Sequence, residues 1–519
     1  MAVGRRGVMA TNILVVGAGP TGLSLALQAH DHGGRVRIVE RRPHAIRPSR
    51  ALIVHPRTLE MLRPLGVVDD MLARADTTPT AKLKLGRRWT RVQIGELDLR
   101  DTAFPHLTLL RQMDIESVLI AALAERGLEV ERDTEVISIE SCSAGAQAVI
   151  RSPRGTESAD FDAVVGSDGP DSTVRRCAGI SWSGGSYTDE VVLADVELDT
   201  VPDRDAAHVL VDRQGLLLVF PLGECATWRV LATCPAGNDT VPFGQPGPPV
   251  SVGALQALLD EAGLEATISS MAWSARYRLQ HRLAERFRVG PLFLTGDAAH
   301  AYSPATGQGM NMGIQDSVNL GWKLAFAASA TDRNALLDSY EIERRPIVRR
   351  ALVLTHLAFW AEASRGLLPS LIRGVAGPLA APLVPILARR RRLIGESLGM
   401  VSQMRAAYRN SPISKEGQPE LAGGSRIGHR LPDAIVTSDG RQFRLHALIA
   451  KPGVHVLLQQ DADPIESEDF GPCVSVHRLT GTEGIGLIAV RPDGYVGFRC
   501  GVADPGQLRS WLAQVGAFT

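Results

Sequence analysis

The chain has 519 residues, more than one hydrophobic core usually supports, so we expect two or three domains. Its 56 Lys and Arg residues balance 56 Asp and Glu residues, and no long basic block is present, which excludes a typical nucleic-acid-binding protein. The six cysteines show neither metal-like spacing nor a Cys-x-x-Cys pair, and the first ten residues lack the apolar stretch of a signal peptide. We therefore expect reduced thiols in a cytoplasmic protein.

A glycine-rich loop follows the first apolar segment. Residues 12–16 predict a buried strand and residues 23–29 a helix, and a second predicted strand, 36–39, ends at Glu40, where a Rossmann unit places its ribose-binding carboxylate. Glycines in such a loop allow a tight turn, close approach of a pyrophosphate and close packing of helix and strand. This context predicts a dinucleotide site that comprises Gly17, Ala18, Gly19, Pro20, Thr21, Gly22, Glu40 and Arg41.

A second glycine-rich loop lies near the middle of the chain. Residues 291–295 predict a buried strand that places Asp297 just after its carboxyl end, where ligands of open α/β sheets bind. Residues 307–311, Gly-Gln-Gly-Met-Asn, then lead into a segment with apolar residues at helical spacing. The start of a helix presents unpaired N–H groups and a partial positive charge, which suit an anion or a ring that becomes anionic on reduction.

Together these segments resemble the flavin-dependent class A monooxygenases, the single-component aromatic-ring hydroxylases. Residues 296–300 and 307–311, with Pro304 between them, look like the second FAD fingerprint of that family, and residues 164–172 are similar to its Asp-Gly motif. Two further segments, Ser49-Arg50-Ala51 and Arg111-Gln112, match segments that contact FAD. The resemblance is strong over residues 11–350.

The resemblance implies a role for each matched residue. Glu40 is expected at the adenosine ribose, Asp168 as an anchor of the FAD region, and Asp297 at the ribityl chain. Arg50 and Gln112 are expected to support the pyrophosphate and flavin. The loop before the second helix would place Pro304 beside the isoalloxazine ring and Gly307, Gly309, Met310 and Asn311 near the flavin, the last three as backbone donors to its pyrimidine edge.

Each candidate also has an ordinary structural interpretation. Asp168 and Asp297 could form turns or cap helices, Glu40 and Arg50 could be an exposed ion pair, and Gln112 could cap its helix. Two histidines, His300 and His55, receive no catalytic role, because a loop histidine is at least as often a structural hydrogen-bonding group.

The expected fold is α/β, with a Rossmann-like FAD-binding domain, an inserted antiparallel β-sheet substrate domain, a helical connection and a thioredoxin-like C-terminal domain. Phe220 lies on the expected sheet and either contacts substrate or belongs to the sheet core. The predicted boundaries are 11–180 and 286–350 for the two parts of the FAD-binding domain, 181–285 for the sheet, 351–420 for the connection and 421–519 for the C-terminal domain.

The C-terminal part lacks a Cys-x-x-Cys pair, so we expect packing or dimer contacts from it, rather than thiol redox chemistry, and a homodimer stays open. Residues 367–388 are mostly apolar but contain Arg373 and three prolines. Because a spanning helix needs about 20 predominantly apolar residues, we expect packing between domains there and no membrane contact.

By resemblance, the expected enzyme binds FAD, oxidises NADPH or NADH, and uses O2 to hydroxylate an aromatic or polyketide-like small molecule through a flavin C4a-hydroperoxide. Three alternatives stay open: a Baeyer–Villiger or epoxidising monooxygenase on the same scaffold, a flavin-dependent dehydrogenase or reductase, and a flavin-binding protein without catalytic activity. The sequence identifies neither the substrate nor the preferred nicotinamide cofactor.

Overall fold

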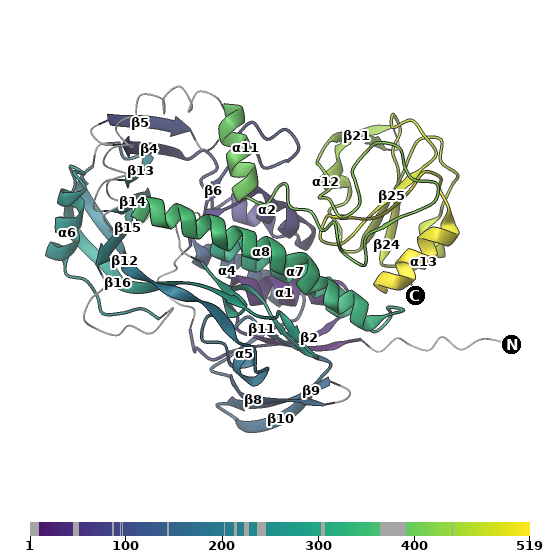
Figure 1. Ribbon diagram of the computed structural model, residues 1–519, viewed down its shortest axis with the longest axis horizontal. Helices are drawn as coiled ribbons and strands as arrows, with labels where there is room; N and C mark the ends of the chain where they lie inside the picture. Colours follow the sequence, from purple (N-terminus) through teal and green to yellow (C-terminus); the bar gives the residue numbers. More distant parts are fainter. Residues whose placement is uncertain are drawn as a thin grey trace.

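The computed structural model describes residues 10–44, 51–85, 88–93, 95, 97–142, 145–201, 203–211, 215–222, 228–235, 245–302, 307–363, 391–438 and 440–518. Figure 1 shows a central part built on a six-stranded sheet, an eight-stranded sheet on one side of it and the C-terminal part on the other.

A six-stranded sheet forms the centre of the molecule. Its inner strands are parallel, and β1 (Asn12–Val16) pairs with both β2 (Arg35–Glu40) and β11 (Ala163–Gly166). β1 and β11 are short, buried and mostly apolar, as expected for parallel strands that are covered on both faces, whereas β2 carries Arg35, Arg37 and Glu40 and is buried only at Ile38 and Val39. The other members are β18 (Leu292–Leu294), β17 (Arg288–Val289) and β7 (Val130–Arg132), in the order β17-β18-β11-β1-β2-β7.

Two layers cover this sheet (Figure 1). On one side α1 (Pro20–Asp31) packs against α4 (Gln112–Glu125) and α7 (Gln308–Phe326). On the other lie α5 (Thr173–Cys177) and a three-stranded sheet of β8 (Glu135–Cys142), β9 (Gly145–Ser152) and β10 (Gly155–Phe161). The predicted strand-turn-helix of the first glycine loop is confirmed by β1 and α1.

The eight-stranded sheet contains the predicted inserted strands but is larger than predicted. Its two longest strands, β12 (Trp182–Thr200) and β16 (Thr267–Ala284), pair antiparallel near one edge. Two strands come from earlier in the chain, β4 (Thr80–Leu85) and β5 (Arg88–Gln93), and β4 pairs with β13 (Ala206–Val211) in parallel. The expectation of a purely antiparallel sheet confined to 181–285 therefore missed this edge. The remaining strands are β14 (Leu216–Pro221), β15 (Trp228–Pro235) and β19 (His300–Ala301), and α6 (Val252–Glu261) packs on β16.

The long helix α8 (Arg333–Ala363) runs across the front of the molecule in Figure 1 and packs against α7. After α11 (Arg391–Val401) the chain forms a five-stranded sheet in the order β20-β26-β25-β23-β24. These strands are β20 (Lys415–Glu416), β26 (Val496–Cys500), β25 (Leu487–Val490), β23 (Val454–Leu458) and β24 (Val474–Arg478). The hairpin β21 (Ile435–Ser438) and β22 (Arg441–Arg444), α12 (Leu445–Leu448) and the final helix α13 (Pro505–Val515) complete this part.

Short elements complete the described chain and connect the larger ones. They are β3 (Ile53–Val54) paired with β6 (Thr108–Leu109), α2 (Pro56–Leu62), α3 (Val68–Leu72), and the 3-10 turns at Arg63–Leu65, Gly296–Ala298 and Ser467–Asp469. Within the described ranges, no helix is both long and apolar enough to cross a membrane. The apolar residues 367–388 lie outside the described residues.

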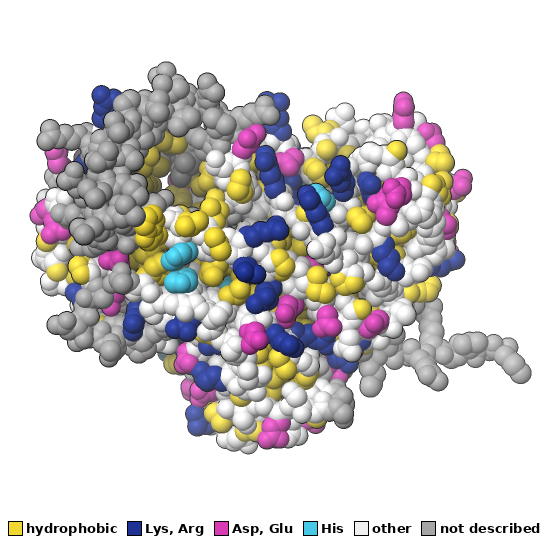
Figure 2. All heavy atoms as spheres, in the orientation of Figure 1, with side chains coloured by type: hydrophobic (Ala, Val, Ile, Leu, Met, Phe, Trp, Pro, Cys, Tyr) yellow, Lys and Arg dark blue, Asp and Glu magenta, His cyan; other side chains and the backbone are white. Residues whose placement is uncertain are grey.

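Figure 2 shows Lys and Arg side chains interspersed with Asp and Glu side chains over the nucleotide-binding and C-terminal parts, in keeping with the balanced charge of the sequence. On the same face, hydrophobic side chains gather over the part of α8 drawn at the left.

Candidate functional site

The first glycine loop takes a shape that only glycine allows at two positions. Gly17 has a φ of +102°, and a Cβ added there would lie 2.4 Å from the carbonyl oxygen of Ser167. A Cβ on Gly22 would lie 1.9 Å from the carbonyl oxygen of Gly17, so this glycine brings α1 against the loop. Gly19 differs, because a Cβ there meets nothing within 4 Å and no side chain caps the start of α1. The loop thus leaves room beside exposed N–H donors, which suits a diphosphate.

The second glycine loop meets the first directly. Gly307 has a φ of +60° and precedes α7, whose start has no side-chain cap. A Cβ on Gly313 of α7 would lie 2.3 Å from the Thr21 hydroxyl oxygen, and the hydroxyl of Ser317 donates to the Thr21 carbonyl at 2.7 Å. Because α7 packs this closely on the first turn of α1, the starts of both helices border the same space.

Glu40 lies at the end of β2 with its carboxylate turned toward the first loop. One oxygen accepts a hydrogen bond from the N–H of Ala18 and the other from the N–H of Arg42, each at 3.0 Å. A carboxylate has about four lone-pair sites. Glu40 therefore keeps acceptor capacity for a ribose hydroxyl while it stabilises the loop.

Asp168 follows β11 and serves the start of α5. Its Oδ2 accepts a hydrogen bond from the N–H of Thr173 at 2.7 Å. Burial raises the pKa of the Asp168 carboxyl. The helix-capping interpretation is thus correct for one oxygen. Asp168 also lines a cavity between the glycine loops and the eight-stranded sheet.

A cavity of about 390 Å³ lies where these loops meet the eight-stranded sheet. Its size falls in the usual range for small-molecule sites, about 300–1,000 Å³. The predicted residues that line it are Gly17, Ala18, Gly19, Pro20, Thr21, Glu40, Arg41, Gln112, Asp168, Asp297, Gly307, Gly309 and Met310. Gly22 and Asn311 do not line it, whereas Arg50 and Pro304 lie outside the described residues.

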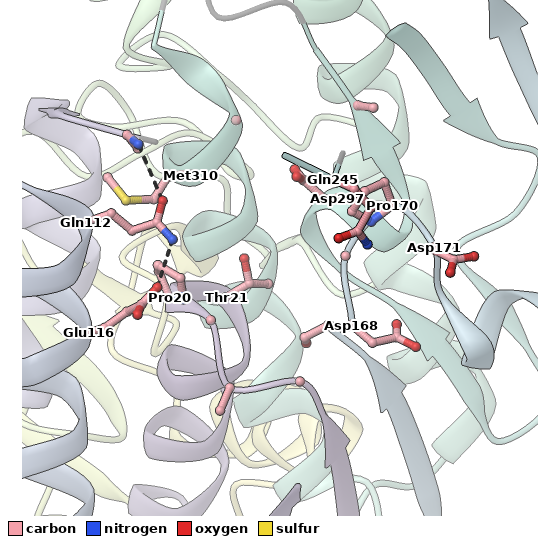
Figure 3. A pocket seen from close by; sticks show the side chains of 18 of the residues that line it. Pro20, Thr21, Gln112, Glu116, Asp168, Pro170, Asp171, Gln245, Asp297 and Met310 are labelled. Carbon is pink, nitrogen blue, oxygen red and sulfur yellow. Dashed lines mark hydrogen bonds between the residues drawn. The ribbon is translucent and has the colours of Figure 1, made fainter. Parts of the chain in front are cut away.

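The predicted residues approach the cavity from two sides. In Figure 3, Asp168 and Asp297 lie on one side of the opening, Gln112 and Met310 on the other, and Thr21 lies between them. A Cβ on Gly309 would lie 4.0 Å from Asp297 Oδ1, so the predicted ribityl and flavin contacts are neighbours. The residues present therefore fit an extended dinucleotide along both helix starts.

Gln112 is held by two contacts, both drawn in Figure 3. Its side-chain oxygen accepts a hydrogen bond from the N–H of Ala51 at 3.4 Å, and its amide nitrogen donates to Glu116 at 2.8 Å. Burial raises the pKa of the Glu116 carboxyl. Gln112 thereby ties the start of α4 to the chain that enters β3.

Asn311 supports the site from behind. Its side-chain amide donates to the carbonyls of Ile53 (2.9 Å) and Gly307 (2.8 Å), and its oxygen accepts from the N–H of His55 (2.9 Å). The side chain thus holds β3 and the start of α2 against α7. The residues around Ile53 and His55 show no sequence pattern that would predict these backbone hydrogen bonds to the side chain of Asn311.

His300 is also structural. Its Nε2 lies 2.6 Å from Asp316 Oδ2, and Arg344 donates to Asp316 Oδ1 at 2.7 Å, with all three side chains fully buried. Burial raises the pKa of the Asp316 carboxyl, but the charges of Arg344 and His300 outweigh that effect and lower it. Since Asp316 also accepts from the N–H of Gly296 at 3.2 Å, this cluster holds the loop that carries Asp297.

The side of the cavity opposite the glycine loops was largely missed by the sequence interpretation. Phe220 is the predicted sheet residue that lines it, while further apolar and polar residues come from five parts of the chain. These are Val191, Leu193, Leu218, Arg229, Leu231, Gln245, Tyr277, Arg278 and Leu279. Both faces of this sheet contain apolar clusters, so alternation along a strand does not show which face lines a cavity.

Comparisons with known proteins agree with this architecture. The family described as "FAD binding domain" matches residues 10–355. A 6-methylpretetramide 4-monooxygenase from Streptomyces rimosus is 32% identical over 87% of this chain and 78% of its own length. A 12-dehydrotetracycline 5-monooxygenase/anhydrotetracycline 6-monooxygenase from Streptomyces rimosus subsp. rimosus is 31% identical over 96% of both chains. The solved structure of an anhydrotetracycline hydroxylase from Streptomyces rimosus covers 98% of this chain and 100% of its own, with a TM-score of 0.77 and 26% identity.

The sequence motifs, the cavity at two glycine loops and these comparisons lead to one assignment. The two relatives match along most of this chain at more than 30% identity. The chain belongs to the family of FAD-dependent monooxygenases of the aromatic-ring hydroxylase type, which carry this FAD-binding domain.

Proposed function

We propose that the protein binds FAD along the two glycine loops and uses NAD(P)H and O2 to hydroxylate a multi-ring, polyketide-like aromatic compound. The observation that carries this proposal is a single cavity with helix starts on one side and an apolar sheet surface on the other. When bound, FAD supplies the redox chemistry by taking hydride from NAD(P)H and activating O2 for transfer of one oxygen atom. The substrate class is supported by the two relatives described above, which are named for 6-methylpretetramide and for 12-dehydrotetracycline and anhydrotetracycline.

The glycine loops supply the binding groups for FAD. Ala18 and Gly19 lie at the start of α1, where N–H groups and the helix dipole favour a pyrophosphate, and Glu40 accepts from the ribose. Gly309 and Met310 lie in the first turn of α7, and N–H groups held there stabilise negative charge that develops on a reduced ring. Asp297 is assigned to the ribityl chain.

The sheet side of the cavity supplies the substrate contacts. Leu193, Leu231 and Tyr277 are buried apolar residues that line it and offer a surface for aromatic rings. Arg229 lies among them and is held by Asp195 through two hydrogen bonds of 2.8 and 2.9 Å. These residues orient the substrate and keep water from the reacting atoms.

An oxygen-labelling experiment tests the proposal. The purified holoprotein is incubated with NADPH or NADH and a panel that includes single-ring phenols and tetracyclic polyketides, under labelled O2. We expect a tetracyclic compound to accelerate NAD(P)H oxidation and to gain one labelled oxygen atom by mass spectrometry. Oxidation of NAD(P)H without label in any product would contradict the proposal.

A variant pair tests the position of the substrate. Leu218→Trp places a large ring in the cavity and is expected to abolish stimulation of NAD(P)H oxidation by substrate while FAD stays bound. The matched change Val289→Trp, at a half-exposed position on the edge strand β17, is expected to leave stimulation unchanged. If substrate stimulates NAD(P)H oxidation equally in both variants, the substrate does not bind against Leu218 in this cavity.

We further propose a cytoplasmic protein, as the cysteine pattern in the sequence suggests, and a thioredoxin-like C-terminal fold without thiol chemistry. Cys473 and Cys500 are free thiols. A homodimer stays a proposal, and sedimentation of the holoprotein tests it.

A further inference from the structure

A tight turn of the C-terminal part, residues 491–495, is buried where the C-terminal part packs against the FAD-binding part. The sequence Arg-Pro-Asp-Gly is typical of a turn, and the N–H of Gly494 donates to the carbonyl of Arg491 at 2.9 Å. Gly494 has a φ of +77°. Arg491, Asp493 and Tyr495 are each at most 1% exposed, so the turn is enclosed by other parts of the chain.

The turn binds α7 and α8 through buried charges. Arg491 donates two hydrogen bonds to Glu343 of α8, at 2.6 and 2.8 Å, and Glu343 also pairs with Lys323 of α7 at 2.6 Å. Asp493 accepts from the Asn319 amide of α7 at 2.9 Å. Buried charges of this kind are costly unless paired, so removal of one partner disturbs the others.

The same turn also binds α2. The Arg57 guanidinium donates to the carbonyl of Asp493 at 2.8 Å and lies 4.8 Å from the centre of the Tyr495 ring. Arg57 is two residues from His55, whose N–H is held by Asn311. The contact therefore reaches the β3–α2 segment, which borders the cavity at Ile53.

A third contact leads to the loop that carries Asp297. The ring of Tyr495 stacks on Tyr408 with centres 4.0 Å apart, and Arg344 donates to the Tyr408 hydroxyl at 3.4 Å. Arg344 in turn holds Asp316, which accepts from the N–H of Gly296. Three of the segments that line the cavity, at Ile53, at Asp297 and at the start of α7, are thus connected to one turn.

We propose that the Arg491–Tyr495 turn positions the FAD site, with Arg491 and Asp493 as positioning residues, although neither lines the cavity. The turn holds the middle of α7 and the start of α2, so that the first turn of α7 and the β3 backbone keep the spacing that FAD requires. This inference rests on the flavin position proposed above. It gives the C-terminal part a task in cofactor binding that needs no thiol chemistry.

The test compares two identical substitutions in the C-terminal part. Arg491→Met removes the positive charge that pairs with Glu343. Arg499→Met removes the ion pair between Arg499 of β26 and Glu416 of β20, whose charged atoms lie 2.7 Å apart, and this pair does not involve the turn. FAD is removed from each purified protein, and binding is measured by titration with FAD and flavin fluorescence. Hydrogen exchange of residues 53–58 and 308–316 is measured without FAD, as a readout independent of turnover.

We expect Arg491→Met to raise the FAD dissociation constant by about tenfold, a typical effect for a residue that acts through a network. Exchange should become faster in both segments. Arg499→Met should change the constant by less than about twofold, as for a site without shared partners. Equal FAD binding and equal exchange in Arg491→Met and the unchanged protein would overturn the inference.

Two further variants keep the result decisive. If Arg491→Met does not fold, as judged by far-UV circular dichroism, the same FAD titration is carried out on Arg491→Lys. Lysine keeps the positive charge but loses the paired hydrogen bonds of the guanidinium to Glu343. Asp297→Ala tests the flavin position itself. Weak FAD binding in Asp297→Ala with normal binding in Arg491→Met would refute only the positioning role, whereas normal binding in both would refute the flavin position as well.

Discussion

Gly19 and Gly22 lie three residues apart, yet a methyl group would meet opposite surroundings at the two positions. At Gly22 it would overlap the Gly17 carbonyl, whereas at Gly19 the space is open and the φ of −77° suits any residue. We expect Gly22→Ala to lower the free energy of unfolding by about 1–3 kcal/mol, as other overpacked sites do. Gly19→Ala should unfold normally without FAD but bind FAD about tenfold more weakly, because its methyl group occupies the pyrophosphate space.

Thermal unfolding of the FAD-free proteins and titration with FAD separate these two effects. An unaltered FAD affinity in Gly19→Ala would contradict the assignment of the pyrophosphate to this loop. An unaltered stability in Gly22→Ala would contradict the close packing of α1 on the loop.

At the scale of elements, α2 is joined to the C-terminal part by a buried ion pair. Arg430 donates to both carboxylate oxygens of Glu60, at 2.7 and 2.5 Å. Burial alone raises the pKa of the Glu60 carboxyl, but the charge and hydrogen bonds of Arg430 outweigh it and lower the pKa from 4.5 to about 2. Because the folded protein has the lower pKa, this stabilisation is fully present above pH 4.5 and is lost as the pH falls toward 2.

We expect Glu60→Gln to reduce stability at pH 7 by about 3 kcal/mol, since each pKa unit corresponds to about 1.4 kcal/mol. Its free energy of unfolding should also depend less on pH between 4.5 and 2, the range of the Glu60 pKa values. Urea unfolding from pH 7 to pH 2 measures both. The control Glu157→Gln removes an exposed partner of Arg37 and should cost less than about 1 kcal/mol. A pH dependence in Glu60→Gln as steep as in the unchanged protein would contradict this assignment.

At the scale of the whole molecule, the FAD-binding and C-terminal parts share one core. Trp322 and Phe326 of α7 pack in the same apolar cluster as Val456 and Trp511. A chain that ends at residue 409 would expose these rings and leave Glu343 without Arg491, and loss of one partner of a buried pair costs about 3–5 kcal/mol.

We therefore expect the shortened chain to aggregate, or to retain much less than one FAD per chain. Its FAD absorbance and thermal unfolding are compared with those of the full-length protein. A shortened chain with full FAD content and an unchanged unfolding temperature would show that the two parts are independent.

The sequence by itself determined the family, the strand-turn-helix of the first loop and the start of α7, because glycines, short apolar runs and helical spacing are local patterns. Only the tertiary structure decided that Asn311 and His300 act behind the cavity and that β4 and β5 join the large sheet. It also decided which face of that sheet lines the cavity and brought the turn at Arg491 to α2, α7 and α8. These contacts join residues far apart in the chain, and the buried partners that determine them leave no periodic signal in either segment.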